Sequence, residues 1–267
     1  MPRRAAEPQL GGAMSTAQAF KKLAIETNLY LPVRWLKRRL DSGELEAHLE
    51  LMRLYRSLIA EDSLCFDVGA NIGAVSEALL KVGARVIAFE PNPTVLPELQ
   101  ARCGRHKNWS LVPAAIGNQA DIATLYERKL CGQSSLGADW EGEVIATHNV
   151  PVITLDAAIR RFGAPAYCKI DVEGYELQVL EGLTQPISLL SFEFHLTPRD
   201  IEKTIACLKH LQSFGPARVN VTSAERSTLH FKEWVVLADF TAQFPQQLEK
   251  SLLGKPYGDL WVHFEAS

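Results

Sequence analysis

The sequence has no long apolar run and little excess of charge of either sign, and both absences restrict what the chain can do. Its 267 residues carry 28 Lys and Arg against 31 Asp and Glu, a formal net charge of -3 at pH 7. We therefore expect no nucleic-acid partner and no attraction to an anionic membrane. No apolar stretch approaches the length of a bilayer span, so we expect no integral membrane segment.

The sequence also lacks a secretory signal and any paired cysteine motif. Its first residues include two arginines but no apolar segment of the kind that follows them in a secretory signal. None of the five cysteines forms a C-x-x-C pair, and no zinc-binding spacing appears among the cysteines and the seven histidines. Cys65 and Cys168 lie inside apolar, strand-like runs, which indicates reduced, buried thiols in a cytoplasmic protein.

The chain divides into residues 1–60, a predicted tail and helical extension, and residues 61–267, the predicted main domain. We expect residues 1–16 to be disordered and Pro32 to separate two short helices within 17–40. The basic residues of 34–39 could face a membrane or an anionic substrate, although a solvated helix face is favoured. A capping-box spacing at Asp41 then predicts a helix to about residue 59. Its apolar positions are Leu45, Leu49, Met52, Tyr55 and Ile59.

From Leu64 onward, short apolar runs alternate with helical patterns, which predicts an α/β fold with a parallel, doubly wound sheet. The expected strands are 64–69, 85–90, 109–117, 166–171, 189–194, 217–222, 233–240 and 259–266. Thr197 and Pro198 predict the start of a helix that Gly215 ends. Residues 118–165 are less regular and more polar, and predict a β-hairpin or insertion on the substrate side.

The stretch "FDVGANIG" at 66–73 predicts a strand followed by a ligand-binding turn. Gly69 and Gly73 would let the backbone approach a ligand closely, and Asn71 is among the few residues that tolerate left-handed backbone angles. Asp67 precedes this turn. Glu90 ends the next strand, where an acid about 20 residues beyond the turn binds the ribose hydroxyls of an adenosine.

These features favour S-adenosylmethionine over a dinucleotide. A pyrophosphate would be repelled by Asp67, whereas the ammonium group of S-adenosylmethionine would be attracted by it. The alternative is structural: Asp67 could cap the following helix, and Glu90 could begin a turn before Pro91. We favour the ligand because both acids close apolar strands, where a neutral residue would cost less.

Three blocks of sequence resemble the FkbM-type methyltransferases, a branch of the class I S-adenosylmethionine-dependent fold. They are "FDVGANIG", "AFEPNP" and "KIDVEGYELQVLEGL", and the resemblance covers roughly residues 62–195. It implies a Rossmann-like sheet of seven strands, mostly parallel with an antiparallel last strand. It also implies methyl transfer, often to a hydroxyl of a natural product or sugar, so we expect a small-molecule or glycan acceptor. A homodimer stays open.

The resemblance places the reacting methyl group beside the ends of the strands at 166–171 and 189–194. Asp171, Glu193 and His195 are therefore candidates for orienting the acceptor hydroxyl or accepting its proton. Asp171 could instead cap the next helix. Glu193 needs a partner, for which Lys169 and the substrate are equal candidates.

Further residues are expected to line the site. Asn92 could reach the adenine edge, and Ala115 and Ile116, at the end of the third strand, could contact the adenine. Residues 131–137, "CGQSSLG", form either a substrate loop or a plain surface loop. Magnesium could bind Asp171, Glu173 and Glu193, although we expect no metal.

Two other functions are open on the sequence alone. One is a nucleotide-binding oxidoreductase on a related sheet, although the sequence has no Tyr-x-x-x-Lys pair, a common hydride-transfer device. The other is a module that binds S-adenosylmethionine without catalysis.

Overall fold

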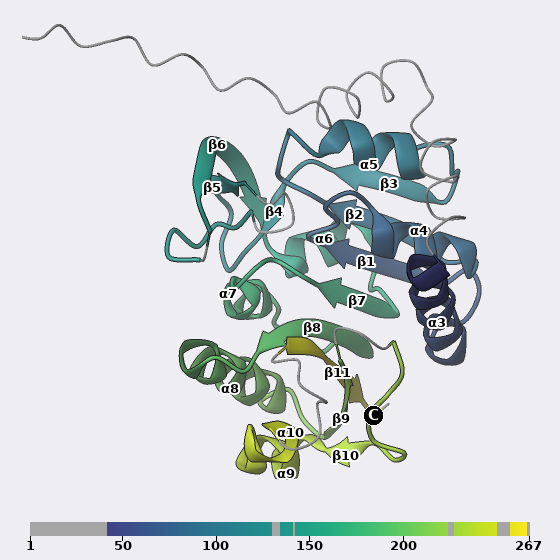
Figure 1. The fold of residues 1–267 in the computed structure, drawn as a ribbon, viewed down its shortest axis with the longest axis vertical. Helices are drawn as coiled ribbons and strands as arrows, with labels where there is room; N and C mark the ends of the chain where they lie inside the picture. The colour runs from purple at the N-terminus through teal and green to yellow at the C-terminus, as the bar shows by residue number, and fades with distance from the viewer. Residues whose placement is uncertain (1–41, 130–133, 141, 224–226, 250–256, 266–267) are drawn as a thin grey trace, which may run out of the picture.

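The computed structural model describes residues 42–129, 134–140, 142–223, 227–249 and 257–265. Its main sheet has eight strands (Figure 1). Their spatial order is β10 (Val235–Val236), β9 (Ala217–Ser223), β11 (Tyr257–Phe264), β8 (Leu189–His195), β7 (Tyr167–Ile170), β1 (Leu64–Val68), β2 (Arg85–Phe89) and β3 (Trp109–Val112). The helices are α3 (Ser42–Leu58), α4 (Ala74–Lys81), α5 (Leu96–Cys103), α6 (Leu155–Phe162), α7 (Glu176–Glu181), α8 (Pro198–Gln212), α9 (Leu237–Gln243) and α10 (Gln246–Glu249).

The strand directions confirm the predicted doubly wound sheet. Strands β3, β2, β1, β7 and β8 pair in parallel, and the last strand, β11, runs antiparallel between β8 and β9. The predicted count of seven was wrong by one, because the two-residue strand β10 adds an antiparallel edge next to β9. The expected strand at 233–240 is confirmed only at Val235–Val236, which form β10; the chain turns helical at Leu237, where Leu237 and Phe240 bury one side of α9.

Alternation along the strands separates two buried layers. On β1, Phe66 and Val68 face a core that is covered by α6, α7, α8 and α9. Cys65 faces the opposite core, which is covered by α3, α4 and α5. Both faces of the central strands are therefore shielded from water, as their nearly continuous apolar sequences predict. Four cysteines are buried and free, as expected: Cys65, Cys103, Cys168 and Cys207.

The predicted helix before the sheet is confirmed as α3, which packs against the core that contains Cys65. Tyr55 is buried, with its ring centroid 5.6 Å from that of Tyr167 and 6.2 Å from that of Trp261. Leu49 was expected on the buried stripe but is 40% exposed. The predictions for the tail, the basic segment and the Asp41 cap lie outside the described residues. No helix in the described part of the chain is long and apolar enough to cross a membrane.

A smaller sheet of three strands contains the predicted hairpin. It consists of β4 (Ala115–Ile116), β6 (Val144–Ile153) and β5 (Asp121–Arg128), in that order. We expected Ala115 and Ile116 to end the third strand, and this was wrong. Strand β3 stops at Val112, and Ala115 and Ile116 form β4, which pairs with β6. Figure 1 shows β5 and β6 beside the main sheet, at the end toward which β1 and β7 point. The hairpin is thus placed at the edge where doubly wound sheets bind ligands.

Candidate cofactor and acceptor site

The turn between β1 and α4 has the left-handed backbone that its sequence predicts. Gly69 has φ 81°, Asn71 has φ 47° and Gly73 has φ 83°. The amide groups of Gly69 and Ala70 donate to the carbonyl of Phe89 at 3.0 and 3.1 Å, which fixes the turn against the end of β2. Asn71 adopts the left-handed conformation although it is not a glycine, as expected.

The two glycines are needed for close approach to protein atoms. A Cβ on Gly69 would overlap the carbonyl oxygen of Asp171, and a Cβ on Gly73 would lie 2.7 Å from Cδ1 of Leu99. Gly69 therefore lets the end of β7 pack onto the turn, and Gly73 lets α5 pack behind it. Close approach to a ligand was expected for both, but Gly73 is not among the residues that line the cleft.

Glu90 lies at the carboxyl end of β2, and its carboxylate spans the loop. One oxygen accepts from the backbone amide of Asn71 and the other from that of Asn92, both at 2.7 Å. Glu90 is 6% exposed, and burial raises its pKa to about 7, although the two amide bonds act in the opposite direction. The carboxylate is thus held in one orientation, with lone pairs left for a ligand.

Glu90 and the turn line an open cleft with a cavity volume of about 210 Å³. Its lining has a polar part, with Gly69, Asn71, Glu90 and Asp171 among its residues. Its apolar part consists of Val68, Phe89, Val95, Ala114, Ala115, Ile116, Leu125 and Leu136. Ala115 and Ile116 therefore line the cleft, although they belong to the smaller sheet. A flat apolar group and a polyol could both be bound here.

Asp67 lies beneath the turn and does not line the cleft. Its side chain is 1% exposed, and Oδ2 accepts a hydrogen bond of 2.5 Å from the hydroxyl of Ser76 in the first turn of α4. Burial raises the pKa of Asp67 to about 6, against the effect of the Ser76 bond. Asp67 therefore contacts the first turn of α4 through the Ser76 hydroxyl, although the cap position of that helix is Gly73. Any attraction of Asp67 for a ligand would act through the turn.

Asn92 lines the cleft, but its side chain is bound to neighbouring loops. Its Oδ1 accepts from the amide of Thr94 at 2.9 Å, and its Nδ2 donates to the hydroxyl of Ser134 at 3.2 Å. Ser134 and Ser135 belong to the hydroxyl-rich segment, of which residues 134–137 are described, and both line the cleft. The described part of this segment thus faces the cleft.

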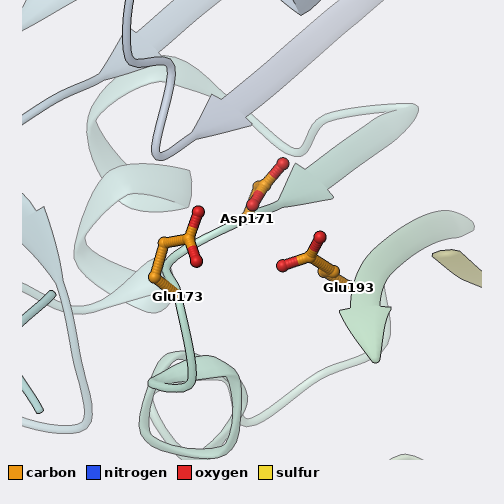
Figure 2. A group of neighbouring side chains, drawn as sticks. All are labelled: Asp171, Glu173 and Glu193. Carbon is orange, nitrogen blue, oxygen red and sulfur yellow. The ribbon is translucent and has the colours of Figure 1, made fainter. Parts of the chain in front are cut away.

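Three carboxylates meet at the ends of β7 and β8 (Figure 2). Asp171 follows β7, Glu173 lies in the next turn with φ 54°, and Glu193 lies on β8. One oxygen from each lies within 4.8 Å of the others, a group that could hold a metal ion. The alternative of a bound magnesium ion therefore has a geometric basis, and our expectation of no metal is not tested. Asp171 does not cap α7, because that helix begins only at Glu176.

Several acids in and beside this cluster have raised pKa values. Burial and the charges of Asp171 and Glu193 raise the pKa of Glu173 to about 9, so Glu173 is protonated at neutral pH. Burial and Asp171 also raise the pKa of Glu193. Glu176, which accepts from the amides of Val172 and Gly174, has its pKa raised to about 7 by burial. The cluster can therefore accept or share a proton near neutral pH.

Lys169 is the cation next to this cluster. Its Nζ lies 2.7 Å from Oδ1 of Asp259 on β11 and 3.4 Å from Oδ2 of Asp171. Burial would lower the pKa of Lys169, but the carboxylates of Asp171, Asp259 and Glu193 hold it well above its usual value. Lys169 was one of two expected partners of Glu193; it instead bonds Asp259, and the Glu193 carboxylate lies 3.2 Å from Nε2 of His195.

His195 ends β8 between two aromatic rings. Its ring stacks on Tyr257 at 5.5 Å and meets the edge of Trp140 at 5.4 Å. Burial would lower the pKa of His195, but the hydrogen bond and charge of Glu193 outweigh it and raise this pKa. Glu193 and His195 thus form a pair in which a proton can be held by either group.

Trp140 and Arg128 are site residues that the sequence reasoning missed. The guanidinium of Arg128 is 1% exposed and donates to the carbonyls of Tyr126, Gly137, Ala138 and Trp140. Arg199 also bonds Asp139. These contacts fix residues 137–140, so that the Trp140 ring lies where a Cβ on Gly174 would be. The one signal in the sequence for this part of the site is Trp140 itself, a large aromatic residue within an otherwise polar insertion.

Comparison with known proteins points to one family. A family model described as the methyltransferase FkbM domain matches residues 67–215, more than half of the 267 residues. The chain is 27% identical over 173 residues to the hexuronic acid methyltransferase AglP of Haloferax volcanii, which covers 61% of this chain and 70% of that protein. The matched residues extend from Asp67 to beyond His195, so the family match includes both the turn with Glu90 and the cluster of Asp171, Glu173 and Glu193.

Solved structures of methyltransferases are also similar. A precorrin-6y C5,15-methyltransferase from Geobacter metallireducens has 12% identity and a TM-score of 0.43, over 83% of this chain and 88% of that chain. Aeropyrum pernix fibrillarin, in complex with natively bound S-adenosyl-L-methionine, has 9% identity and a TM-score of 0.43, over 77% of this chain and 68% of that chain.

Proposed function

The chain belongs to the FkbM methyltransferase family, and we propose that it uses S-adenosylmethionine to methylate a hydroxyl group of a sugar or another small molecule. The observation that carries the proposal is the Glu90 carboxylate, which two backbone amides hold at the lip of an open cleft. A charged acceptor in that position suits the paired hydroxyls of a ribose. The proposal therefore joins a cofactor half around Glu90 to an acceptor half around Asp171.

The residues of the cofactor half fit S-adenosylmethionine. Glu90 would accept from the ribose hydroxyls, and the apolar part with Ala115 and Ile116 would contact the adenine. Among the described residues, none donates a hydrogen bond to the buried Oδ1 of Asn71, which lines the cleft. That atom could accept a bond from the cofactor's ammonium group, with the charge of Asp67 behind it. S-adenosylmethionine supplies a methyl group that is already activated on a sulfonium.

The chain's own task is then to orient the acceptor and take its proton. Asp171 faces the cleft and would accept a hydrogen bond from the acceptor hydroxyl. The hydroxyl oxygen would lose its proton as it bonds to the methyl carbon and the carbon–sulfur bond breaks, with S-adenosylhomocysteine as the leaving group. The pair of Glu193 and His195 would receive the proton. Lys169 keeps a positive charge beside Asp171. Most of the rate would come from holding the acceptor hydroxyl in line with the methyl group.

A sugar acceptor is the class that the site favours. Carboxylates are strong acceptors for hydroxyl donors, and a polyol offers several donors to Asp171 and Glu193, while the protonated Glu173 could donate to a sugar oxygen. Trp140 adds an aromatic wall beside His195, against which the apolar face of a sugar ring could pack. The similarity to a hexuronic acid methyltransferase points to the same class.

Calorimetry tests the cofactor half directly. S-adenosylhomocysteine should bind saturably, and NAD should not, because a pyrophosphate would meet Asp171 in the cleft and the charge of Asp67 behind the turn. Saturable NAD binding without a response to S-adenosylhomocysteine would favour the oxidoreductase alternative. Binding of the cofactor without methyl transfer to any fraction of a cell extract would favour the catalytically silent module.

A further inference from the structure

Glu127 is a buried acid on the β5–β6 hairpin that the proposed reaction does not use. It is 7% exposed, and its Oε2 accepts from the hydroxyl of Thr94 at 3.1 Å and lies 2.7 Å from Nε2 of His148. Thr94 lies in the loop after β2, and His148 lies on β6. A single carboxylate oxygen therefore joins the hairpin to the loop that contains the cofactor residues.

The contact continues to Glu90 through hydrogen bonds that run along the loop. The amide of Thr94 donates to Oδ1 of Asn92 at 2.9 Å, and the amide of Asn92 donates to Oε1 of Glu90 at 2.7 Å. Leu125, two residues before Glu127 on β5, lines the cofactor cleft from the same side of the strand. The position of the hairpin and the orientation of Glu90 are thus mechanically connected.

Glu127 contacts His148 across the hairpin, but the strand pairing itself is made by the backbone. The strands pair from Asp121 with Val152 to Arg128 with Val144, and an exposed ion pair between Lys129 and Glu143, 3.1 Å apart, lies at the end where the connecting segment joins them. A buried carboxylate is costly, and an apolar residue at position 127 would fill the same space without that cost. Two contacts offset this cost: His148 lies on the hairpin itself, whereas Thr94 lies on the loop after β2, so the contact with Thr94 is the one that connects the two segments.

We propose that Thr94 and Glu127 form a latch that fixes the hairpin on the loop after β2 and thereby sets the affinity for the cofactor. The inference rests on the proposed function, since the cleft must bind S-adenosylmethionine. With the latch closed, the loop that orients Glu90 and the wall with Leu125 are already in place, so binding costs less ordering. Both residues are positioning residues; neither lines the cleft.

Calorimetry with S-adenosylhomocysteine tests the latch without any acceptor. Thr94→Val keeps the shape of the side chain and removes the hydroxyl, and should weaken binding by about 5–30-fold. Thr94→Ser restores the hydroxyl and should bind like the wild type. Thr124→Val is the matched control, because Thr124 is an exposed threonine on the same hairpin; its affinity should not change.

A double variant separates the latch from two independent effects. Glu127→Ala should weaken binding at least as much as Thr94→Val, because it removes the contact with His148 as well as the one with Thr94. The double variant should be no weaker than Glu127→Ala alone, because Thr94 has already lost that contact in Glu127→Ala. Thermal unfolding of each variant shows whether the fold is intact. Wild-type affinity in Thr94→Val, or losses that multiply in the double variant, would overturn the latch. Absence of binding by the wild-type chain would instead overturn the proposed function.

Discussion

Gly69 and Asp171 are in direct backbone contact, so that the turn of the cofactor half and the first carboxylate of the acceptor half are built against each other. A Cβ on Gly69 would overlap the carbonyl oxygen of Asp171, and Gly69 has φ 81°. The amide of Asp171 also donates to the carbonyl of Val68, the residue before this glycine. Movement of one half therefore displaces the other.

Gly69→Ala should disrupt both halves. Left-handed backbone strain costs about 1–2 kcal/mol, and the clash with β7 should bring the loss of unfolding free energy to about 3 kcal/mol or more. Gly163→Ala is the matched control, because Gly163 has φ 97° but a Cβ there would come only within 3.7 Å of Leu64. Urea unfolding and calorimetry measure both variants. Equal stability and equal S-adenosylhomocysteine affinity in the two variants would contradict the packing account.

Cofactor affinity should depend on pH through Glu90. Burial raises the pKa of this carboxyl to about 7, and only the ionised form accepts from both ribose hydroxyls. Affinity for S-adenosylhomocysteine should therefore fall as pH decreases below about 7 and level off above it. Glu90→Ala should weaken binding by roughly 30–150-fold at pH 8 and reduce this pH dependence. Calorimetry between pH 5.5 and pH 8.5 would refute the ribose placement if the variant matched the wild type.

Lys169→Met should destabilise the fold strongly, because it leaves Asp259 beside a low-dielectric core without its cation. Breaking a buried ion pair costs about 3–5 kcal/mol, whereas replacing both partners by apolar groups is often nearly neutral. The double variant Lys169→Met with Asp259→Leu should thus recover most of the unfolding free energy. Lys129→Met, which breaks an exposed pair with Glu143, should cost less than about 1 kcal/mol. Similar losses for the two lysine variants in urea unfolding would speak against a buried pair.

His195→Ala should lower turnover by about 10²–10⁴-fold if the imidazole takes the acceptor's proton. Cofactor affinity should hardly change, because His195 does not line the cofactor cleft. Glu193 raises the pKa of His195, and only the neutral ring can accept a proton. The wild-type rate should therefore keep rising above pH 7, and the rise should be lost in the variant.

The control for that experiment is His263→Ala, which removes an exposed imidazole on β11. Normal turnover in His195→Ala would assign the proton to Asp171 or Glu193. A fall of equal size in both histidine variants would mean that the loss is not specific to the site.

The sequence predicts the parts of the site that local patterns determine. Acids at the ends of apolar strands indicate Glu90 and Asp171, because such strands end at one edge of a parallel sheet. The left-handed angle of Asn71 follows from its place between two glycines. Each of these inferences needs only a few neighbouring residues and the geometry of the strand–turn–helix unit.

Contacts between distant segments could not be predicted in this way. Lys169 bonds Asp259, which lies 90 residues later, and the pattern of the last strand gives no sign of that pairing. Asp67 sits beneath the turn because Ser76 meets it there, which is a matter of tertiary packing. The latch between Thr94 and Glu127 depends on where an irregular insertion folds back.

The most direct test of the account is transfer of a labelled methyl group. The protein would be incubated with methyl-tritiated S-adenosylmethionine and fractionated metabolites and glycans, with Glu90→Ala as the control. Methyl ethers resist alkaline hydrolysis and methyl esters do not, so treatment with base separates a hydroxyl acceptor from a carboxylate. The account predicts base-stable label in a sugar-containing fraction, at a rate that Glu90→Ala reduces at subsaturating cofactor. Label that base removes, or no label in any fraction, would contradict it.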